Sequence, residues 1–180
     1  ARAPGPVAYC DQVPWVFDGT LRENILAGAP YEAGRYLEAL KLSQLLQDIQ
    51  ILPGGDDCHL NGVSGPLNDN QSCRLAMARA AYSPAEMVLI DRPAGSDQAW
   101  RAGDFETLLC SSLFEGRTRL VVMPGRPTAL SAFDLVLVLE RGRVVAHGPP
   151  EQVIRSSAFH CLVARTAVPC NVAGKASLSG

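Results

Sequence analysis

The chain has 180 residues, of which 47% are hydrophobic and 19% are charged, and this composition predicts one globular domain with a sizeable core rather than a disordered chain. A formal net charge of −2 without any basic run argues against nucleic acid as a partner, because nucleic-acid-binding proteins usually carry a concentrated positive field. No stretch has the length of a membrane span, and the first residues lack the apolar core of a signal peptide. We therefore expect the segment itself to be soluble.

The cysteines and histidines are too scattered to indicate a disulfide framework or a zinc site. None of the six cysteines forms a C-x-x-C pair, so we expect reduced thiols. His59, His147 and His160 show no metal-ligand spacing with one another or with the cysteines. Neither kind of structural cross-link is therefore predicted.

The first half of the chain has the pattern of a strand followed by helices. Residues 7–10, VAYC, form a short strand-like run that ends before the polar pair Asp11 and Gln12. Apolar residues then recur at steps of three and four, as in an amphipathic helix: Tyr36, Leu37, Leu40, Leu45, Leu46 and Ile49. The turn-rich stretches 52–57 and 61–69 predict loops. We expect a mostly helical block from about residue 20 to residue 82.

The second half of the chain has the pattern of a covered sheet. Residues 86–91, 118–123 and 134–140 are continuous apolar runs, and strands that are apolar on both faces belong to largely parallel sheets. We expect the runs at 7–10, 86–91 and 119–123 to be parallel strands, with 86–91 and 119–123 as neighbours. Residues 104–114 indicate a crossover helix whose inward-facing side chains are Phe105, Leu108, Leu109 and Phe114.

The end of the chain combines a hairpin signal with a loss of pattern. The run at 134–140 turns at Arg141, Gly142 and Arg143 into VVAHG, which predicts a hairpin around Gly142. From about Ser156 the apolar pattern fades, so residues 156–180 are predicted to be a tail or linker. The predicted fold class is α/β, with helices and a parallel sheet in one chain.

The stretch at 67–80, LNDNQSCRLAMARA, predicts a helix with a polar first turn. Asn68, Asp69 and Asn70 place three small polar side chains there. A helix N-terminus carries partial positive charge and free N–H groups, so it is either capped by such residues or binds a phosphate. Asp69 cannot serve both purposes at once.

The order of these landmarks resembles the ATP-binding cassette of an ABC transporter. The stretches TLRENILAG at 20–28 and AYSPAEMVLID at 81–91 are especially similar to the C subfamily, which includes the multidrug-resistance proteins and the chloride channel of cystic fibrosis. The resemblance covers residues 7 to about 155. It implies a P-loop NTPase-like (RecA-like) α/β fold with a parallel-sheet core and a helical subdomain.

The resemblance also implies how the chain is divided. Residues 1–12 match the end of the N-terminal core sheet up to the Q-loop, residues 13–82 match the helical subdomain with the signature helix, and residues 83–155 match the C-terminal half of the ATPase core. No G-x-x-x-x-G-K-S/T motif occurs, since the pair Gly174 and Lys175 is followed by Ala176. We therefore expect a cassette that lacks its N-terminal Walker A part.

Transferred residue by residue, the resemblance implies a set of nucleotide contacts. Gln12 matches the Q-loop glutamine, which in the family touches magnesium and couples to the membrane domain. Leu67 and Gln71 match the first and last residues of the signature Leu-Ser-Gly-Gly-Gln, and Asp91 matches the aspartate that ends the Walker B strand. The D-loop matches are Ser96 and Asp97. The implied cofactors are ATP, contacted by Gln12, Leu67, Gln71, Asp91 and Asp97, and Mg²⁺, held by Gln12 and Asp91.

Several positions depart from the family's pattern, and each departure removes a phosphate contact or a catalytic group. Asn68, Asp69 and Asn70 replace the Ser and two Gly of the signature, and the charge of Asp69 would repel a phosphate by about 1–4 kcal/mol. We therefore favour a self-capped helix over a phosphate site. Arg92 stands where the family has the acid that positions the attacking water, and a guanidinium cannot accept a proton. Pro124 replaces the switch histidine and offers no side-chain donor.

The matches and departures together predict a partial, degenerate nucleotide-binding domain, a pseudo-ATPase, of a C-subfamily membrane exporter. We expect a structural or regulatory role at the cytoplasmic face of a membrane, with a transmembrane domain and a second nucleotide-binding domain as partners. The chain alone is expected neither to hydrolyse ATP nor to bind it tightly. Two alternatives stay open: a drifted copy that couples to nothing, and a soluble α/β interaction module.

The exposure of one aromatic segment separates these readings. In the family, residues matching 14–25 face the coupling helices of the membrane domain, and a free module should not keep Trp15, Val16 and Phe17 exposed there. The alternative is that Trp15 packs in the core. For Asp91 the alternative to a magnesium contact is an acid that caps the loop after a strand.

Overall fold

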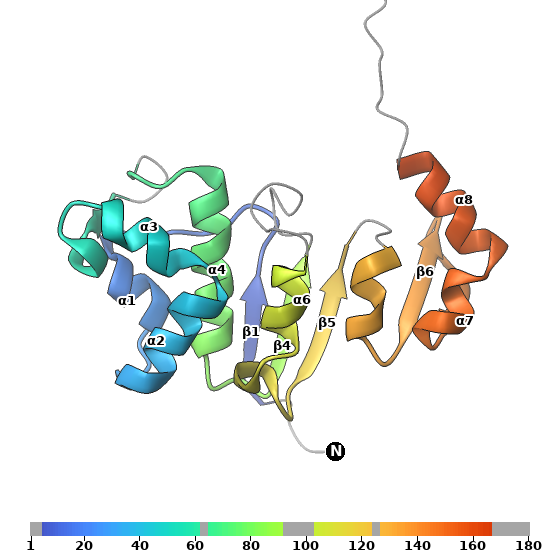
Figure 1. Cartoon of the computed structure of the whole chain (residues 1–180), viewed down its shortest axis with the longest axis horizontal. Coiled ribbons are helices and arrows are strands. Elements are labelled where there is room, and N and C mark those ends of the chain that lie inside the picture. The colour runs from blue at the N-terminus through green and yellow to red at the C-terminus, as the bar shows by residue number, and fades with distance from the viewer. Residues whose placement is uncertain (1–4, 62–64, 92–102, 124–126, 167–180) are drawn as a thin grey trace, which may run out of the picture. The chain divides into compact units, whose positions relative to one another are not determined.

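The computed structural model describes residues 5–61, 65–91, 103–123 and 127–166. The chain divides into two compact units, Ala1–Met123 and Pro124–Gly180, and each is described by itself. Figure 1 shows the elements of both units in chain order. No helix in the described ranges is both long enough and apolar enough to cross a membrane.

Three parallel strands form the sheet of the first unit, in the order β1-β4-β5. They are β1 (Val7–Cys10), β4 (Met87–Asp91) and β5 (Thr118–Val122). Ala8 pairs with Val88, which in turn pairs with Arg119, so β4 is the central strand. The predicted parallel pairing of these three apolar runs is confirmed.

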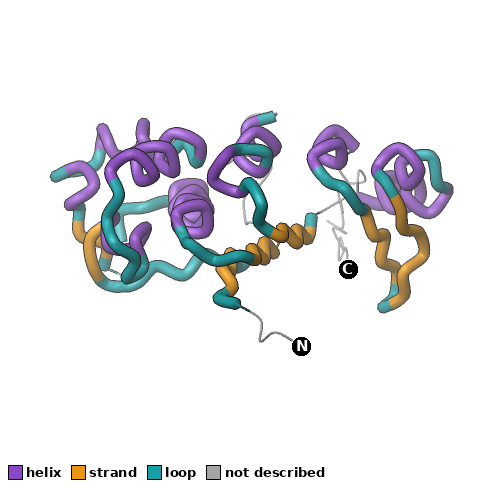
Figure 2. The backbone as a smooth tube through the Cα atoms, turned by 90° about the horizontal axis from the view of Figure 1, so that it is seen from below, coloured by secondary structure: helices purple, strands orange, loops and turns teal. Residues whose placement is uncertain are grey.

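Helices cover one face of this sheet (Figure 2). Helix α4 (Asp69–Tyr82) packs against β1, and the crossover helix α6 (Asp104–Leu109) lies on the same side and continues into the 3₁₀ helix η3 (Ser112–Phe114). The side chains buried by this packing alternate along β1 and β4: Ala8, Cys10, Val88 and Ile90. The four side chains predicted to face inward from the crossover are also buried: Phe105, Leu108, Leu109 and Phe114.

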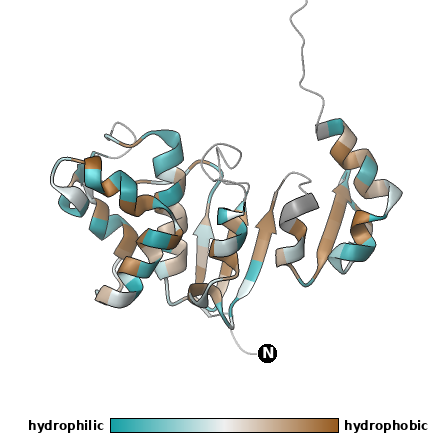
Figure 3. Cartoon of the chain, in the orientation of Figure 1, coloured by the Kyte–Doolittle hydropathy of each residue, from teal (hydrophilic) through white to brown (hydrophobic). Residues whose placement is uncertain are grey.

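The opposite face of the sheet is apolar but exposed. The strand register places Tyr9, Leu89 and Leu120 in one row across it, and Tyr9 and Leu120 are 56% and 53% exposed. Figure 3 shows hydrophobic colouring along much of β5. Parallel sheets usually have both faces covered. Within the described residues this sheet is therefore an open two-layer arrangement with a hydrophobic outer surface.

Among its described residues, the helical block between β1 and β4 contains four α-helices, in the range that the sequence predicts. They are α1 (Leu21–Leu26), α2 (Ala33–Leu42), α3 (Leu45–Ile51) and α4. The break between α2 and α3 falls at Gln44, whose φ of 61° is left-handed and cannot continue a helix. The pairing of β2 (Gly19–Thr20) with β3 (His59–Leu60) was not predicted. Two-residue strands are too short to show the alternation of apolar and polar residues that predicts a strand.

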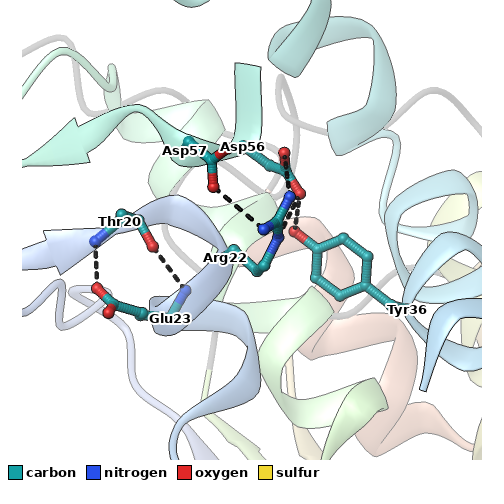
Figure 4. A network of polar contacts seen from close by, with 6 residues as sticks. All are labelled: Thr20, Arg22, Glu23, Tyr36, Asp56 and Asp57. Atoms are coloured by element: carbon teal, nitrogen blue, oxygen red, sulfur yellow. Dashed lines mark hydrogen bonds and ion pairs between the residues drawn. The ribbon is translucent and has the colours of Figure 1, made fainter. Parts of the chain in front are cut away.

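A polar network ties α1 and α2 to the 3₁₀ helix η1 (Gly55–Asp57) (Figure 4). Arg22 donates from Nε and Nη2 to the two carboxylate oxygens of Asp56, at 2.9 and 3.0 Å. The hydroxyl of Tyr36 donates to Asp56 Oδ2 at 3.0 Å. Burial acts to raise the pKa of Asp56, but the hydrogen bonds from Arg22 and Tyr36 outweigh it and hold that pKa below its ordinary value. Asp56 is therefore an ionised link between three elements.

In the second unit, two strands form an antiparallel hairpin. The strands are β6 (Val136–Glu140) and β7 (Arg143–Gly148), and Glu140 pairs with Arg143 across a two-residue turn. Arg141 and Gly142 in that turn both have positive φ, 48° and 76°, as a type I′ turn requires. The predicted hairpin around Gly142 is confirmed.

The prediction that order fades from about Ser156 is wrong for the residues that follow it. After η4 (Pro127–Ala132) and the hairpin, α7 (Pro150–Ile154) leads into α8 (Ser157–Thr166). The backbone N–H of Phe159 donates to the hydroxyl of Ser156 at 3.2 Å, and the Phe159 ring is 2% exposed. The hydrogen bond to Ser156 and the buried side chain of Phe159 thus stabilise α8. The small and polar residues that surround Phe159 in the sequence are those of a linker, which is why the helix was not predicted. Residues 167–180 of the predicted tail lie outside the described residues.

We predict that Asp56→Asn weakens the helical block in a pH-dependent way. At pH 7 the free energy of unfolding of the variant should be about 1 kcal/mol lower than that of the parent. The loss is smaller than for a fully buried ion pair, because Arg22 is partly exposed and solvent screens its charge. Because the folded-state pKa of Asp56 is depressed, its stabilisation is present above the ordinary Asp pKa of about 3.9 and is lost as the pH falls through the lower folded value.

Urea unfolding of both proteins from pH 7 to pH 2.5 measures this difference. Asp57→Asn is the matched control, because the ion pair of Asp57 with Arg22, at 3.1 Å, is more exposed. A difference between Asp56→Asn and the parent chain that does not shrink at low pH would contradict the prediction.

Candidate functional site

The carboxyl edge of the parallel sheet gathers the polar residues at the ends of β1 and β4. Cys10 pairs with Ile90, so the chain leaves β1 toward Gln12 at the same edge at which Asp91 ends β4. Gln12 is exposed and Asp91 is partly buried. The structure thus brings these two predicted residues to one edge of the sheet.

A third polar residue at this edge, Asp11, was missed as a candidate. Its carboxylate accepts the backbone N–H of Gln12 at 2.6 Å and the hydroxyl of Tyr9 at 3.4 Å. The pKa of Tyr9 is raised, first by desolvation and then by the negative charges of Asp11 and Asp91. Asp11 therefore bonds to the Tyr9 phenol directly, and Asp91 acts on it through its charge. The position of Asp11 directly after a strand was the available signal.

The donors at this edge match a hard cation by chemical type, although the described residues contain no group of three or more His, Cys, Asp or Glu placed to hold a metal ion. Mg²⁺ prefers carboxylate and amide oxygens, and Asp91 and Gln12 supply one of each, with Asp11 beside them.

Four residues of the predicted site lie outside the described residues: Arg92, Ser96, Asp97 and Pro124.

The N-terminus of α4 is capped by its own residues. Asn68 is the N-cap, and its side-chain oxygen accepts the backbone N–H of Gln71 at 3.0 Å. Gln71 returns the contact, because its Oε1 accepts the backbone N–H of Asn68 at 3.0 Å. This reciprocal pair is a capping box. The predicted self-capping is confirmed for Asn68, whereas Asp69 is the first helical residue and places its charge near the positive end of the helix dipole.

The side chain of Gln71 is fully committed to structural contacts. It is buried, and its Nε2 donates to Asp48 Oδ1 on α3 at 3.1 Å. Arg74, one turn further along α4, donates to the other oxygen of Asp48 at 2.9 Å. In the part of the chain that the structure describes, no hydrogen bond or ion pair joins Gln71 to Gln12 or Asp91. The predicted site residues therefore form two separate groups, with Leu67 half-buried directly before the capped turn.

A third functional candidate is the segment after Gln12. Val13 and Trp15 are 76% and 66% exposed, whereas Val16 and Phe17 are partly buried. The alternative that Trp15 packs in the core is therefore wrong. An exposed tryptophan next to an exposed valine is a surface of the kind that binds a partner.

Comparison with known proteins relates the chain to one group of membrane transporters. The human "ATP-binding cassette sub-family C member 4" is 36% identical over 153 residues, which cover 84% of this chain and 11% of the relative. The Arabidopsis thaliana "ABC transporter C family member 13" is 36% identical over 78% of this chain and 10% of the relative. The Saccharomyces cerevisiae "Metal resistance protein YCF1" is 33% identical over 87% of this chain and 10% of the relative.

The chain thus spans about a tenth of the length of these curated relatives. No family model matches the chain.

We predict that Asn68→Ala removes the cap of α4 and lowers the free energy of unfolding by about 1 kcal/mol. The loss arises because the backbone N–H of Gln71 loses its acceptor at a partly buried helix end. Asn70→Ala, in the same turn but outside the capping box, is the control and should change stability less. Thermal melts of the three proteins decide the point, and equal losses in both variants would refute a specific role for Asn68.

Proposed function

The chain belongs to the C subfamily of ATP-binding cassette transporters, and we propose from this that it is a non-catalytic nucleotide-binding domain of a membrane exporter. The parallel sheet β1-β4-β5 then belongs to a P-loop NTPase-like (RecA-like) core. The divisions at residues 1–12, 13–82 and 83–155 follow the same proposal. The role is structural or regulatory, in a protein that works at the cytoplasmic face of a membrane.

The single observation that carries the non-catalytic role is the capping box of α4. A helix start that binds a phosphate must present free backbone N–H groups to it. Here the N–H of Gln71 is occupied by Asn68, and the N–H of Asn68 is occupied by Gln71. Asp69 adds an exposed negative charge at the same turn. This end of α4 does not fit an incoming nucleotide phosphate.

Two sequence positions support the same proposal. Arg92 follows Asp91 where catalysis would need a carboxylate to position water, and a guanidinium is protonated at every relevant pH. Pro124 follows the β5 run where a phosphate-sensing side chain would be needed, and it has no polar side chain. The chain therefore offers neither a general base nor a phosphate sensor at these positions.

The carboxyl edge of the sheet retains groups that would hold Mg²⁺. Asp91 would supply a carboxylate oxygen and Gln12 an amide oxygen, while Asp11 fixes the backbone of Gln12 through the hydrogen bond at 2.6 Å. When bound with ATP, the ion supplies charge neutralisation at the phosphates. Residual nucleotide binding would therefore depend on this edge of the sheet and not on α4.

The exposed surface of Val13 and Trp15 supports a transmembrane domain as partner, with a second nucleotide-binding domain completing the assembly. A drifted copy that couples to nothing has no need to keep a tryptophan 66% exposed, and neither has a free module. The membrane-bound assembly is therefore preferred over both alternatives.

We predict that the purified chain does not turn over ATP. Its rate of phosphate release should equal that of the buffer blank, and Arg92→Glu alone should not raise it, because the N-terminus of α4 remains capped. Asp91→Asn is the control variant. Turnover in the parent chain that Asp91→Asn abolishes would contradict the proposal.

A second prediction concerns pairing with an intact cassette. Asp69→Gly should lower the unfolding free energy by a few tenths to about 1 kcal/mol, because a carboxylate near a helix N-terminus is stabilising. It should not strengthen ATP-dependent pairing with the nucleotide-binding domain of the human relative, since Asn68 and Gln71 still occupy the helix end. Sedimentation with and without ATP measures the pairing. A tenfold gain, about 1.4 kcal/mol, would mean that Asp69 alone blocks the site.

A further inference from the structure

The segment that carries Trp15 is joined to α1 by a buried amide. Asn24 is fully buried, and its Oδ1 accepts the backbone N–H of Phe17 at 3.1 Å while its Nδ2 donates to the carbonyl of Phe17 at 3.0 Å. The same Nδ2 donates to the carbonyl of Thr20 at 3.0 Å. The amide therefore satisfies both backbone groups of Phe17, as a neighbouring strand would.

The guanidinium of Arg79 joins this arrangement to α4. Its Nε donates to the carbonyl of Asn24 at 2.6 Å, and its Nη2 donates to Asn24 Oδ1 at 3.0 Å. Its Nη1 donates to the carbonyl of Trp15 at 2.9 Å. One rigid fork thus holds α1 and the Trp15 segment against α4, which a single ammonium could not do.

The same guanidinium faces two aromatic rings. Its central carbon lies 5.5 Å from the centroid of Trp15 and 5.8 Å from that of Phe17, and the two rings are 5.3 Å apart. Burial lowers the pKa of Arg79, although such a side chain remains charged. The guanidinium is thus largely shielded from solvent, and this strengthens its attraction to the two rings.

These contacts fix Trp15 without burying it. The ring remains 66% exposed although its backbone carbonyl and one of its faces are held by Arg79. A rigid, exposed tryptophan is suited to partner binding, because little side-chain freedom is lost when a partner covers it.

We propose that Arg79 is a positioning residue that presents Trp15 as a rigid anchor for a helix of the transmembrane partner and ties that anchor to α4. The identity of the partner rests on the proposed function, whereas the clamp rests only on the contacts of Arg79. Arg79 and the capped turn at Asn68 both belong to α4. A movement of Trp15 that pulls on Arg79 would therefore act on the same helix that carries the capped turn.

The first experiment measures the clamp with Trp15 as the single tryptophan, in the full chain carrying Trp100→Phe. Acrylamide quenching and fluorescence anisotropy report how exposed and how mobile the ring is. Arg79→Lys should raise the quenching rate constant about twofold and lower the anisotropy, because lysine keeps the charge but loses the fork.

Arg117→Lys is the matched control. Arg117 also uses a guanidinium to bind backbone carbonyls, those of Ala80, Ala81, Ala85 and Leu113, and it lies 5.1 Å from the ring of Phe114. The Arg117→Lys variant should have a lower melting temperature, but its Trp15 quenching and anisotropy, measured well below that temperature, should equal those of the parent. Unchanged signals in Arg79→Lys, or equal changes in both variants, would overturn the clamp.

The second experiment measures the anchor with the detergent-purified transmembrane domain of the human sub-family C member 4 as the probe. Trp15→Ala should weaken binding about 30-fold, as expected for a hot-spot truncation, and Arg79→Lys should weaken it more than Arg117→Lys does. Equal binding by the two lysine variants would overturn the positioning role. Absence of binding by the parent chain would overturn the anchor and the membrane partner, while the fluorescence of Trp15 would still decide the clamp.

Discussion

The burial of α4 is the constraint on which the rest of the first unit depends. This helix packs against β1 and against α1, α2 and α3, so its polar groups must be satisfied by the protein and not by water. The capping box satisfies two N–H groups at its N-terminus, those of Asn68 and Gln71, and Arg117 satisfies carbonyls at its C-terminus. Arg79, in the same helix, donates to the backbone carbonyl of Trp15 and so holds the Trp15 segment against α4. One helix, with side-chain partners at both ends, thus contacts β1 of the sheet and the other three helices.

This requirement explains why Asn68 and Gln71 bond to each other at the start of α4. A helix start that binds a phosphate leaves its N–H groups free until the ligand arrives, which is costly at a partly buried position. Asn68 removes that cost within the chain, and Gln71 in turn reaches Asp48 on α3. The proposed loss of phosphate binding at this helix end rests on the same two residues that stabilise α4.

The open face of the parallel sheet and the exposed Trp15 are different kinds of apolar surface. The row that contains Tyr9 and Leu120 continues across three strands. Trp15 is instead a single ring held by a buried cation and by polar contacts to its backbone. Only the second has the fixed side-chain geometry that favours a specific partner.

The amino-acid sequence by itself determined the class of the fold, because periodicity is a local property. The continuous apolar runs predicted β1, β4 and β5, and the turn residues around Gly142 between two apolar runs predicted the hairpin. Gln12 and Asp91 at the carboxyl edge followed from the resemblance to the transporter cassette, which did not point to Asp11. Tertiary structure alone decided that Asn68 and not Asp69 caps α4, that Gln71 binds Asp48, and that Phe159 orders α8. Those outcomes depend on which side chains meet across large separations in sequence, or on one buried contact, and a local pattern does not contain that information.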